Sequence, residues 1–423
     1  MELMEAKQLV VRSVPPARIE YVWLEQAVGR ILAADQFADG GDLPAQARSR
    51  LDGFALISAD SVGATKERPR FLQLRNELLA AGDEHIFAIQ AGECARVLTG
   101  ARLPTNADAV VAEENTFCQS ASIGLTRGFM PGEGVAPAGS DIQQGRLVLP
   151  KGAILTPTRL ALLAALGCAI IPIFTKPRVA FLATGNELKE LGRCDQGAAE
   201  IVCNNRHLLA WSAALQGAQA IHLGIARDDP DEIATKLAST DADWIVSTGG
   251  VGRGARDYTL NAWKKLGVEI LFEEINLSPG HRTAFGKLDG RLLLGFSGGT
   301  WGAQAAFELL LAPALRAFQG CPWVAPPSVP AVLESPVKNR EGFHKVIRGT
   351  LKRGSSRVFF RPMQKTSHSL FESIGQSLCY AVLTPDHLEC AAGTGVEACF
   401  HDLPLCAFPL FAVESDAKGC SNA

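Results

Sequence analysis

The chain has 423 residues, of which 47% are hydrophobic and 20% are charged, and its formal net charge is −3. At about 150 residues per domain, this length predicts about three domains. The near-neutral charge and the ordinary hydrophobic content exclude an intrinsically disordered chain and a general nucleic-acid binder. We therefore expect a folded multi-domain protein with no nucleic-acid partner.

The sequence predicts neither a signal peptide nor a membrane span. Acidic Glu2 and Glu5 stand where a signal peptide carries basic residues. The longest apolar stretch, residues 160–174, is interrupted by Gly167 and Pro172 and is shorter than the ~20 residues that a span needs. We therefore expect a cytoplasmic protein with no membrane partner. The eleven cysteines include no C-x-x-C pair, so we expect reduced thiols.

The amino-terminal half changes character near residue 40. Apolar residues at helical spacing, beginning with Ile19, predict helical structure within residues 1–40. Over 41–150, short apolar runs alternate with glycine and proline, which predicts a β-rich region. A capped helix is expected over 156–167, where Thr-Pro opens an apolar run and Gly closes it.

Strands and helices alternate after Pro177. The pattern predicts strands at 179–183, 218–223, 244–247, 269–275 and 291–295, with helices beginning at Asn205, Asp231, Asp257 and Trp301. This alternation predicts a doubly wound α/β domain whose parallel sheet is covered on both faces, with ligands at the carboxyl ends of the strands. Prolines between 322 and 330 predict a stiff linker, and short strands are expected over 331–412.

Two loops of this α/β segment offer carboxylates. In 183–188, Gly185 permits a tight turn and Glu187 offers a carboxylate at a strand end. The second loop, 227–230, carries the pair Asp228 and Asp229. An Asp before Pro is also a common helix cap, so a purely structural role for this pair stays open.

The glycine-rich loop 247–259 follows a strand and precedes a helix. Such a loop can direct backbone N–H groups at an anion. It also contains Gly250-x-Gly252-x-x-Ala255, with two glutamates about twenty residues later, which is similar to a dinucleotide-binding fingerprint. That fingerprint normally follows the first strand and here follows the third, so a dinucleotide-dependent oxidoreductase is our third hypothesis.

Two further loops carry candidate anion-binding residues. In 276–283, His281 and Arg282 are placed to meet an anion. The loop 295–300 precedes the last helix, and its Thr300 is a candidate cap for that helix.

Taken together, the motifs resemble the molybdopterin molybdenumtransferases, the family of MoeA and the gephyrin E domain. The matching segments are 184–188, 223–230, 247–251, 257–259 and 284–287 in the α/β part, 51–55, 96–101, 109–111 and 139–142 before it, and more weakly Arg348-Gly349 and Ser367-His368. They occur in the family's order. Each is weak alone, but their combination is specific.

The resemblance implies a domain organisation. It consists of an extended helical segment from 1–25 and 142–176, a β-rich domain over 26–141, a molybdopterin-binding α/β domain over 177–322, a β-barrel domain over 323–412 and a tail over 413–423. The implied assembly is a homodimer, with a site cleft between domains.

The resemblance also implies a reaction. Family members bind adenylylated molybdopterin and molybdate, hydrolyse the adenylyl link with a divalent metal, and release molybdenum cofactor and AMP. The implied catalytic residues are Asp52, Asp141, Glu187, Asp228 and Asp257. Glu187, Asp228 and Asp257 would also hold Mg²⁺, since hard cations favour carboxylate oxygens. Molybdopterin adenylyltransferase and recipient molybdoenzymes are the implied protein partners.

The same resemblance implies a set of residues that bind molybdopterin, which is the substrate of the reaction and not a resident cofactor. They are Thr99, Thr184, Gly185, Thr248, Gly249, Gly250, Gly252, Ser278, His281, Arg282, Ser297, Arg348 and Ser367.

The chain departs from the family at these loops. Ser278-Pro-Gly-His281 replaces Lys-Pro-Gly-Lys, and Ser297-Gly-Gly-Thr300 replaces Pro-Gly-Asn-Pro. The loss of two lysines removes positive charge where an oxyanion needs it, with Arg50 and Arg282 as candidate replacements. These departures favour an alternative function, a non-catalytic molybdopterin-binding carrier or regulatory paralogue.

A basic run lies near the carboxyl end. Residues 338–365 contain nine Lys or Arg and one acidic residue, Glu341. Either these side chains keep outward-facing strands soluble, or they form a positive rim that attracts an anionic ligand.

Overall fold

The structure is a computed structural model, and it describes residues 1–192, 200–252, 258–322, 324–363 and 370–405. Its contacts divide the chain into two compact units. The first contains residues 1–34, 151–160 and 169–423, and the second contains residues 35–150 and 161–168. Each unit is described by itself. The finer division expected from the resemblance stays a prediction.

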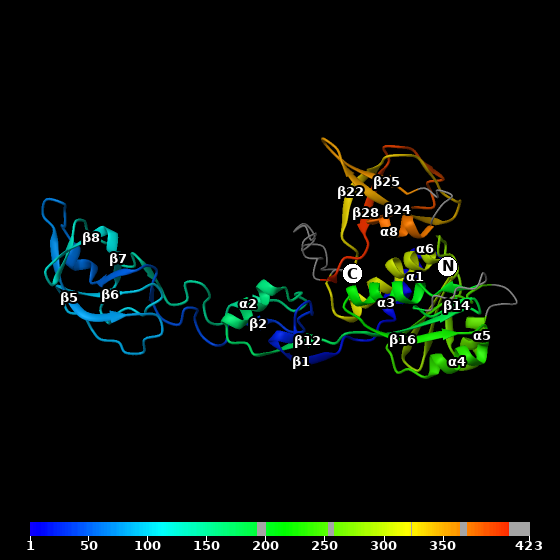
Figure 1. Ribbon diagram of the computed structural model, residues 1–423, viewed down its shortest axis with the longest axis horizontal. Coiled ribbons are helices and arrows are strands. Elements are labelled where there is room, and N and C mark those ends of the chain that lie inside the picture. Colours follow the sequence, from blue (N-terminus) through cyan, green and yellow to red (C-terminus); the bar gives the residue numbers. More distant parts are fainter. Residues whose placement is uncertain (193–199, 253–257, 323, 364–369, 406–423) are drawn as a thin grey trace. The chain divides into compact units, whose positions relative to one another are not determined.

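The second unit is built on a six-stranded sheet, as its β-rich sequence predicts. The strand order is β7 (Ala109–Ala112), β4 (Gly53–Leu56), β6 (Glu93–Val97), β5 (Arg70–Leu79), β9 (Ser122–Leu125) and β8 (Thr116–Gln119). Two short pairs accompany it, β3 (Arg48–Ser49) with β10 (Val135–Ala136) and β2 (Gln36–Phe37) with β11 (Leu147–Leu149). Short 3₁₀ turns lie at Ser58–Ser61 and Glu113–Asn115. Figure 1 draws this unit in blue and cyan.

The expected helical structure within residues 1–40 is only partly present. Helix α1 spans Leu3–Arg12, but Ile19–Trp23 forms strand β1 and pairs antiparallel with β12 (Ile170–Phe174). A 3₁₀ turn, Leu24–Gln26, follows. The helix prediction for this segment was wrong because its β-branched and aromatic residues alternate in exposure and find a partner strand far along the chain.

Helix α2 (Pro157–Ala165) confirms the capped helix. The Oγ1 of Thr156 accepts a hydrogen bond from the N–H of Arg159 at 3.4 Å. Gly167 closes the segment with a φ of +78°, a conformation that glycine adopts without strain.

The α/β domain of the first unit contains a mixed six-stranded sheet. Its order is β16 (Gln219–Ala226), β13 (Arg178–Thr184), β17 (Trp244–Thr248), β21 (Arg291–Phe296), β20 (Thr283–Leu288) and β18 (Glu269–Phe272). The first four strands are parallel, as predicted, whereas β20 runs antiparallel to both of its neighbours, β21 and β18. Strand β20 was not predicted, and β18 ends three residues earlier than expected.

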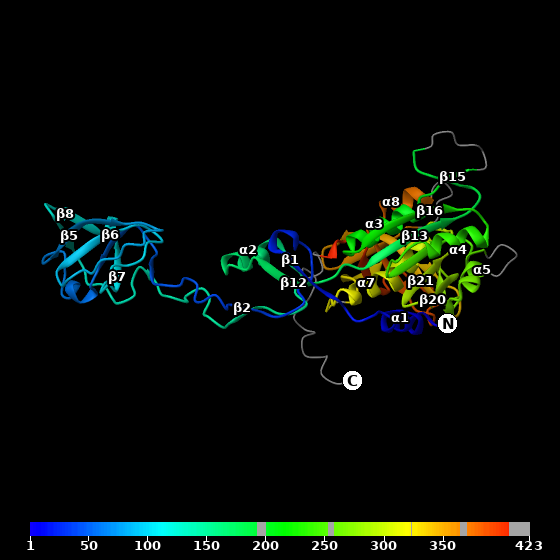
Figure 2. The ribbon, with the colours of Figure 1, turned by 90° about the horizontal axis from the view of Figure 1, so that it is seen from below.

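Helices cover both faces of this sheet (Figures 1 and 2). Helices α1, α3 (Asn205–Leu215), α6 (Thr300–Ala306) and α7 (Ala312–Phe318) share one core with residues such as Phe181 and Trp244. Helices α4 (Pro230–Ala238) and α5 (Tyr258–Leu266) pack on the other face against residues such as Leu182 and Ile245. A π-helical turn, Phe307–Leu311, joins α6 to α7. The doubly wound architecture is confirmed.

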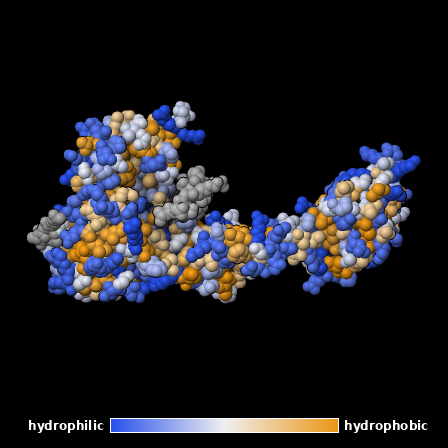
Figure 3. Space-filling model, turned by 180° about the vertical axis from the view of Figure 1, so that it is seen from behind, coloured by the Kyte–Doolittle hydropathy of each residue, from blue (hydrophilic) through white to orange (hydrophobic). Residues whose placement is uncertain are grey.

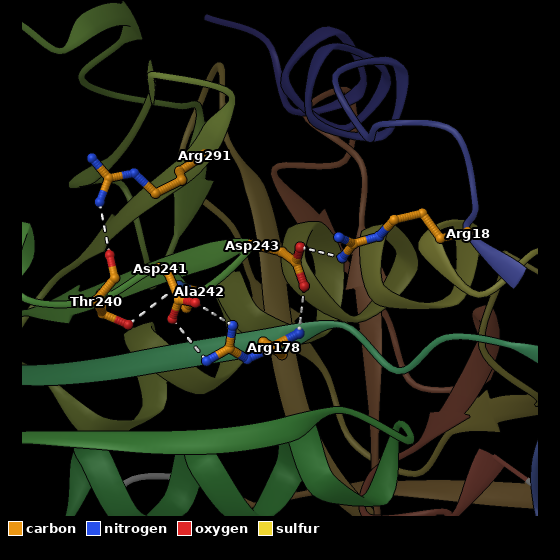
Figure 4. Close-up of polar contacts among 7 residues, drawn as sticks. All are labelled: Arg18, Arg178, Thr240, Asp241, Ala242, Asp243 and Arg291. Carbon is orange, nitrogen blue, oxygen red and sulfur yellow. Dashed lines mark hydrogen bonds and ion pairs between the residues drawn. The ribbon is translucent and has the colours of Figure 1, made fainter. Parts of the chain in front are cut away.

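Arginine–aspartate contacts fix the amino ends of the sheet strands (Figure 4). Asp243, which directly precedes β17, accepts hydrogen bonds from the backbone N–H of Arg178 at 2.8 Å and from the guanidinium of Arg18 at 2.6 Å. Arg178 also forms two 2.8 Å bonds to the carboxylate of Asp241. These contacts join β13, β17 and the segment after α1 at the amino ends of the strands. The predicted loops lie at the opposite, carboxyl ends.

The end of the first unit is a closed five-stranded barrel. The strands are β24 (His344–Arg353), β25 (Val358–Pro362), β22 (Ser328–Leu333), β28 (Gly395–Phe400) and β26 (Cys379–Leu383), and β26 pairs back with β24. A pair formed by β23 (Val337–Lys338) and β27 (Glu389–Cys390) and helix α8 (Leu370–Gln376) accompany it. Pro330 lies inside β22, so the predicted proline linker ends earlier than expected.

Two expectations about the chain's environment can be compared with the structure. Within the described ranges, no helix is long and apolar enough to cross a membrane. The eight cysteines in those ranges are free thiols. The cytoplasmic location stays a prediction.

Candidate functional site

The four parallel strands end side by side at the carboxyl edge of the α/β sheet. In the strand register, Thr184 at the end of β13 is level with Ala226 of β16, and Thr248 of β17 is level with Phe296 of β21. The loops that follow are therefore neighbours. They bring together the predicted residues Thr184, Gly185, Glu187, Asp228, Thr248, Gly249, Gly250, Gly252 and Ser297.

Hydrogen bonds join the loops after β13 and β16. The guanidinium of Arg227 donates to the Asn186 carbonyl at 2.8 Å, and the backbone N–H of Asp228 donates to the Asn186 side chain at 3.2 Å. Asn186 was not predicted as a site residue. It holds the loop of Glu187 next to the loop of Asp228. Glu187 and Asp228 are two of the three expected metal ligands.

The two carboxylates of the second loop, Asp228 and Asp229, have different roles. Asp229 caps helix α4, accepting a hydrogen bond from the N–H of Asp231 at 3.0 Å. The structural interpretation of the pair is therefore confirmed for Asp229. Asp228 is half-buried and does not cap the helix.

Gly185 leaves room for Glu187. A Cβ atom at Gly185, whose φ is +152°, would lie 2.7 Å from both carboxylate oxygens of Glu187. The Glu187 carboxylate thus folds back over the end of β13, and any side chain at residue 185 would displace it.

The glycine loop after β17 is tightly packed. A Cβ atom at Gly249, with φ of +93°, would lie 2.6 Å from the Thr184 carbonyl oxygen. The N–H of Gly249 donates to the Phe296 carbonyl at 3.0 Å, and its carbonyl accepts from Thr259 Oγ1 at 2.9 Å. The expectation that the loop's N–H groups converge on an anion is therefore wrong for Gly249, because the neighbouring strand uses that donor.

Two asparagines position the loop after β21. The side-chain amide of Asn205 donates to the Gly298 carbonyl at 2.7 Å, and that of Asn204 donates to Thr300 Oγ1 at 3.0 Å. Thr300 does not cap helix α6, contrary to expectation, because the cap position is Gly299. The sequence signal that could have indicated these asparagines is their place at the start of a helix facing the sheet edge.

The loop of Ser278 joins the α/β domain to the barrel. Leu277–Ser278 forms strand β19, which pairs in parallel with β24, and Ser278 is level with Lys345. The same loop packs on helix α6, since a Cβ atom at Gly302 would lie 2.8 Å from Ser297 Oγ and 3.2 Å from the Gly280 nitrogen. Gly280 and Ser297 therefore both lie against the start of α6.

A cavity of about 610 Å³ lies between this loop, the start of α6 and the barrel. It is lined by Ser278, Pro279, Gly299, Trp301, Gly302, Pro336, Val337, Lys338, Lys345, Val346, Ile347, Arg348, Pro362 and Met363. Three of these residues are basic and none of the described lining residues is acidic. We name this space the anion cavity.

Arg348 is a buried residue that lines the anion cavity. Only 6% of its surface is exposed, its guanidinium donates to Ser373 Oγ at 2.5 Å, and its Cζ lies 5.3 Å from the centre of the Trp301 ring. Burial lowers the pKa of this guanidinium, because the charged form loses hydration. Its Nε is buried with no hydrogen-bond partner among the residues that the structure describes.

Three members of the basic run 338–365 therefore line the anion cavity, in agreement with the positive-rim hypothesis. Other basic residues of this run lie on the barrel surface, as the alternative of solvent-facing, solubilising side chains predicts. Arg361 and Lys352 both lie against the carboxylate of Glu334 on the barrel surface.

His281 and Arg282 do not line the anion cavity. The Nδ1 of His281 donates to the Ile275 carbonyl at 2.7 Å, its Nε2 lies 3.5 Å from Glu274, and its ring packs on Phe343. Arg282 is exposed. The structure thus does not bring these two side chains to this cavity, and their role in anion binding stays a prediction.

The second unit contains the remaining predicted carboxylates. Asp52 Oδ1 accepts hydrogen bonds from the backbone N–H and the hydroxyl of Thr99, at 2.7 and 2.8 Å. These bonds hold the pKa of the Asp52 carboxyl below its ordinary value, the backbone bond having the larger effect. Asp141 is exposed, and its N–H donates to the Leu43 carbonyl at 3.0 Å. The site roles of Asp52, Thr99 and Asp141 stay predictions.

Asp257 and Ser367 lie outside the described residues. Within the described part of the chain, no three His, Cys, Asp or Glu side chains are grouped as a metal site would require. Glu187 and Asp228 therefore form at most a partial set of ligands here.

The chain matches two known family patterns. Residues 1–167 match the MoeA N-terminal region (domain I and II), and residues 180–317 match a probable molybdopterin binding domain. Fold and matched regions thus define the class, a MoeA-type multi-domain protein whose α/β domain carries the pocket loops.

Known proteins are similar to this chain over most of its length. The molybdopterin molybdenumtransferase of Bacillus subtilis (strain 168) is 30% identical over 391 residues, covering 90% of this chain and 89% of that protein. Molybdopterin molybdenumtransferase 2 of Mycobacterium tuberculosis (strain ATCC 25618 / H37Rv) is 29% identical over 402 residues, covering 93% and 98%. The crystal structure of the molybdopterin biosynthesis MoeA protein from Pyrococcus horikosii has a TM-score of 0.84 at 27% identity, covering 95% and 98%. The chain belongs to the MoeA family.

Proposed function

We propose that this protein inserts molybdate into adenylylated molybdopterin and releases AMP. The observation that carries the proposal is the anion cavity beside the strand-end loops, whose described lining contains three basic residues and no acidic one. An oxyanion or phosphate group is stabilised by buried cations with unpaired donors, such as Arg348. The names of the full-length relatives, which are molybdopterin molybdenumtransferases, support the same reaction.

The proposed metal is Mg²⁺, held by Glu187 and Asp228 together with Asp257. The first two fit a hard cation, since both offer carboxylate oxygens from adjacent loops joined through Asn186. When bound, such an ion neutralises charge on a phosphate link as it is hydrolysed. The chain's own part is to hold these loops in register at the end of β13 and β16.

The direct test is AMP release from adenylylated molybdopterin when molybdate is added to the purified chain. Glu187→Gln and Asp228→Asn should each lower the Mg²⁺-dependent rate, because each removes a charged ligand. Asp229→Asn is the matched control: it keeps a capping oxygen on α4 and should release AMP at the wild-type rate. Absence of molybdopterin binding by calorimetry at high ligand concentration would contradict the proposal.

A second candidate function is a non-catalytic molybdopterin-binding carrier or regulator. It is favoured by Ser278 and His281 in place of lysines, and by the engagement of His281 with the Ile275 carbonyl. Molybdate-dependent AMP release would exclude it. The family assignment argues against the third hypothesis, the dinucleotide-dependent oxidoreductase, which requires measurable NAD(P) binding.

We also propose that two copies of the chain associate. Ile19, Tyr21 and Trp23 project from one face of β1, and Tyr21 is 74% exposed. Ile170, the register partner of Trp23, is exposed beside them on β12. Apolar (orange) surface is visible on this segment in Figure 3. A homodimer would remove these side chains from water.

A further inference from the structure

A buried arginine lies behind the loop that carries Glu187. Arg206, the second residue of helix α3, is 4% exposed, and its guanidinium donates to Glu190 Oε2 at 2.5 Å. Arg206 does not line the anion cavity, and Glu190 follows Glu187 by three residues. A buried guanidinium is costly unless it is paired, so this ion pair restricts where the loop can lie.

A short strand connects the ion pair to Glu187. Leu188–Lys189 forms β14, which pairs in parallel with β15 (Ile201–Val202). The N–H of Ile201 donates to the Glu187 carbonyl at 2.8 Å. Sites built on paired strands are held more precisely than sites on free loops. A displacement of Glu190 would therefore also displace Glu187.

The ion pair also lies beside strand β16. A Cβ atom at Gly224 would be 3.6 Å from Glu190 Oε1 and 3.7 Å from Arg206 Nη1, which are ordinary van der Waals separations. Strand β16 leads directly into the loop of Asp228. The pair thus holds the loop of Glu187 against the strand that positions the second proposed metal ligand.

We propose that Arg206 is a positioning residue for Mg²⁺ binding, which acts through Glu190 on the carboxylate of Glu187. Asn186 anchors the loop before Glu187, and Glu190 anchors it after. Residues behind metal ligands change the affinity for the metal because they fix the orientation of the ligands. The inference rests on the proposed function for the choice of metal.

The experiment measures binding of MgCl₂ to the full-length chain by calorimetry. Arg206→Met keeps a long buried side chain without its charge, and it should weaken Mg²⁺ binding about 10- to 100-fold, the usual effect of losing a residue behind a metal ligand. Arg206→Lys keeps a charged donor and should restore part of the affinity. Arg178→Met is the matched control, because it removes an arginine–carboxylate pair from the opposite end of the same sheet. It should bind Mg²⁺ as the wild type does.

A double variant tests the route through Glu190. Glu190→Gln combined with Arg206→Met should bind Mg²⁺ no more weakly than Arg206→Met alone, because both changes break the same contact.

The AMP-release assay separates positioning from a general structural defect. Arg206→Met should raise the Mg²⁺ concentration that gives half the maximal rate and leave the maximal rate near that of the wild type. A chain that is partly unfolded would lose maximal rate instead. Thermal unfolding verifies that each variant is folded.

Equal Mg²⁺ affinities of the wild type and a folded Arg206→Met would overturn the inference. Additive losses in the double variant, or no recovery in a folded Arg206→Lys, would overturn it as well. A Mg²⁺ affinity that Glu187→Gln does not change would overturn this inference together with the proposed metal site. A chain in which Glu187→Gln weakens Mg²⁺ binding and Arg206→Met does not retains the proposed function and loses this positioning role.

Discussion

Ser278 and Lys345 are register partners on adjacent parallel strands, although one belongs to a loop of the α/β domain and the other to the barrel. Both residues line one cavity. The basic residues of that lining come from β23 and β24, so the sequence of the loop alone does not reveal whether the cavity is positively charged.

Replacing Gly249 with alanine should destabilise the α/β domain by about 1–3 kcal/mol, the usual range for a strained backbone residue, with the Thr184 contact adding to the strain. The new Cβ would lie 2.6 Å from the Thr184 carbonyl oxygen at a φ of +93°. Gly267→Ala is the control, because its φ is also positive, +77°, but nothing lies within 4 Å. Thermal unfolding compares the two, and equal melting temperatures would show that the contact has no cost.

The Asp52 carboxyl should titrate at lower pH than an ordinary aspartate, because Thr99 donates two hydrogen bonds to its ionised form. A lowered folded-state pKa contributes stability above the unfolded-state value, near 3.8, that is lost as pH falls through the folded-state value. Thr99→Val removes the hydroxyl and should raise the pKa partway. NMR titration of the carboxyl measures both, and an unchanged pKa in the variant would contradict the assignment.

Tyr21→Arg together with Trp23→Arg should convert the proposed dimer into a monomer. Two charged side chains on the exposed face of β1 would oppose its burial against a second copy. Light scattering after size-exclusion chromatography gives the mass. Trp211→Arg is the control, since Trp211 is also exposed, at 62%, but belongs to a different element, helix α3. A double variant with wild-type mass would exclude this face as the interface.

Asp243→Ala should destabilise the sheet by about 1–3 kcal/mol, because it leaves the backbone N–H of Arg178 without its acceptor. Asp241→Ala removes the bidentate ion pair with Arg178, but the Asp241 side chain is 82% exposed, so the change should be nearly neutral. Urea unfolding of both variants tests the ranking. The reverse order would mean that the exposed pair is the stronger contact.

The α/β domain was largely predictable because its signals are local. Strand–helix alternation and a capping Asp229 depend on residues close together in sequence. Strand β1 was not predictable in this way, because its partner β12 lies far along the chain and its apolar residues also fit a helical spacing.

The candidate site was also predictable only in part. Loops at strand ends were identified because the strands themselves could be placed, and Glu187 and Asp228 do lie on adjacent loops. The use of the Gly249 N–H by Phe296 and the position of His281 depend on contacts between loops, which residue spacing does not encode. Lys345 was visible only as one member of a basic run, since its direction depends on strand register.

Strand β19 has a consequence for how such chains diversify. Because a segment of the α/β domain adds a short strand to β24 of the barrel, backbone pairing joins the two and they are not exchangeable modules. A barrel transplanted from a relative would bring its own side chain opposite residue 278. Recombination within the family should therefore preserve the two segments together, as one inherited block.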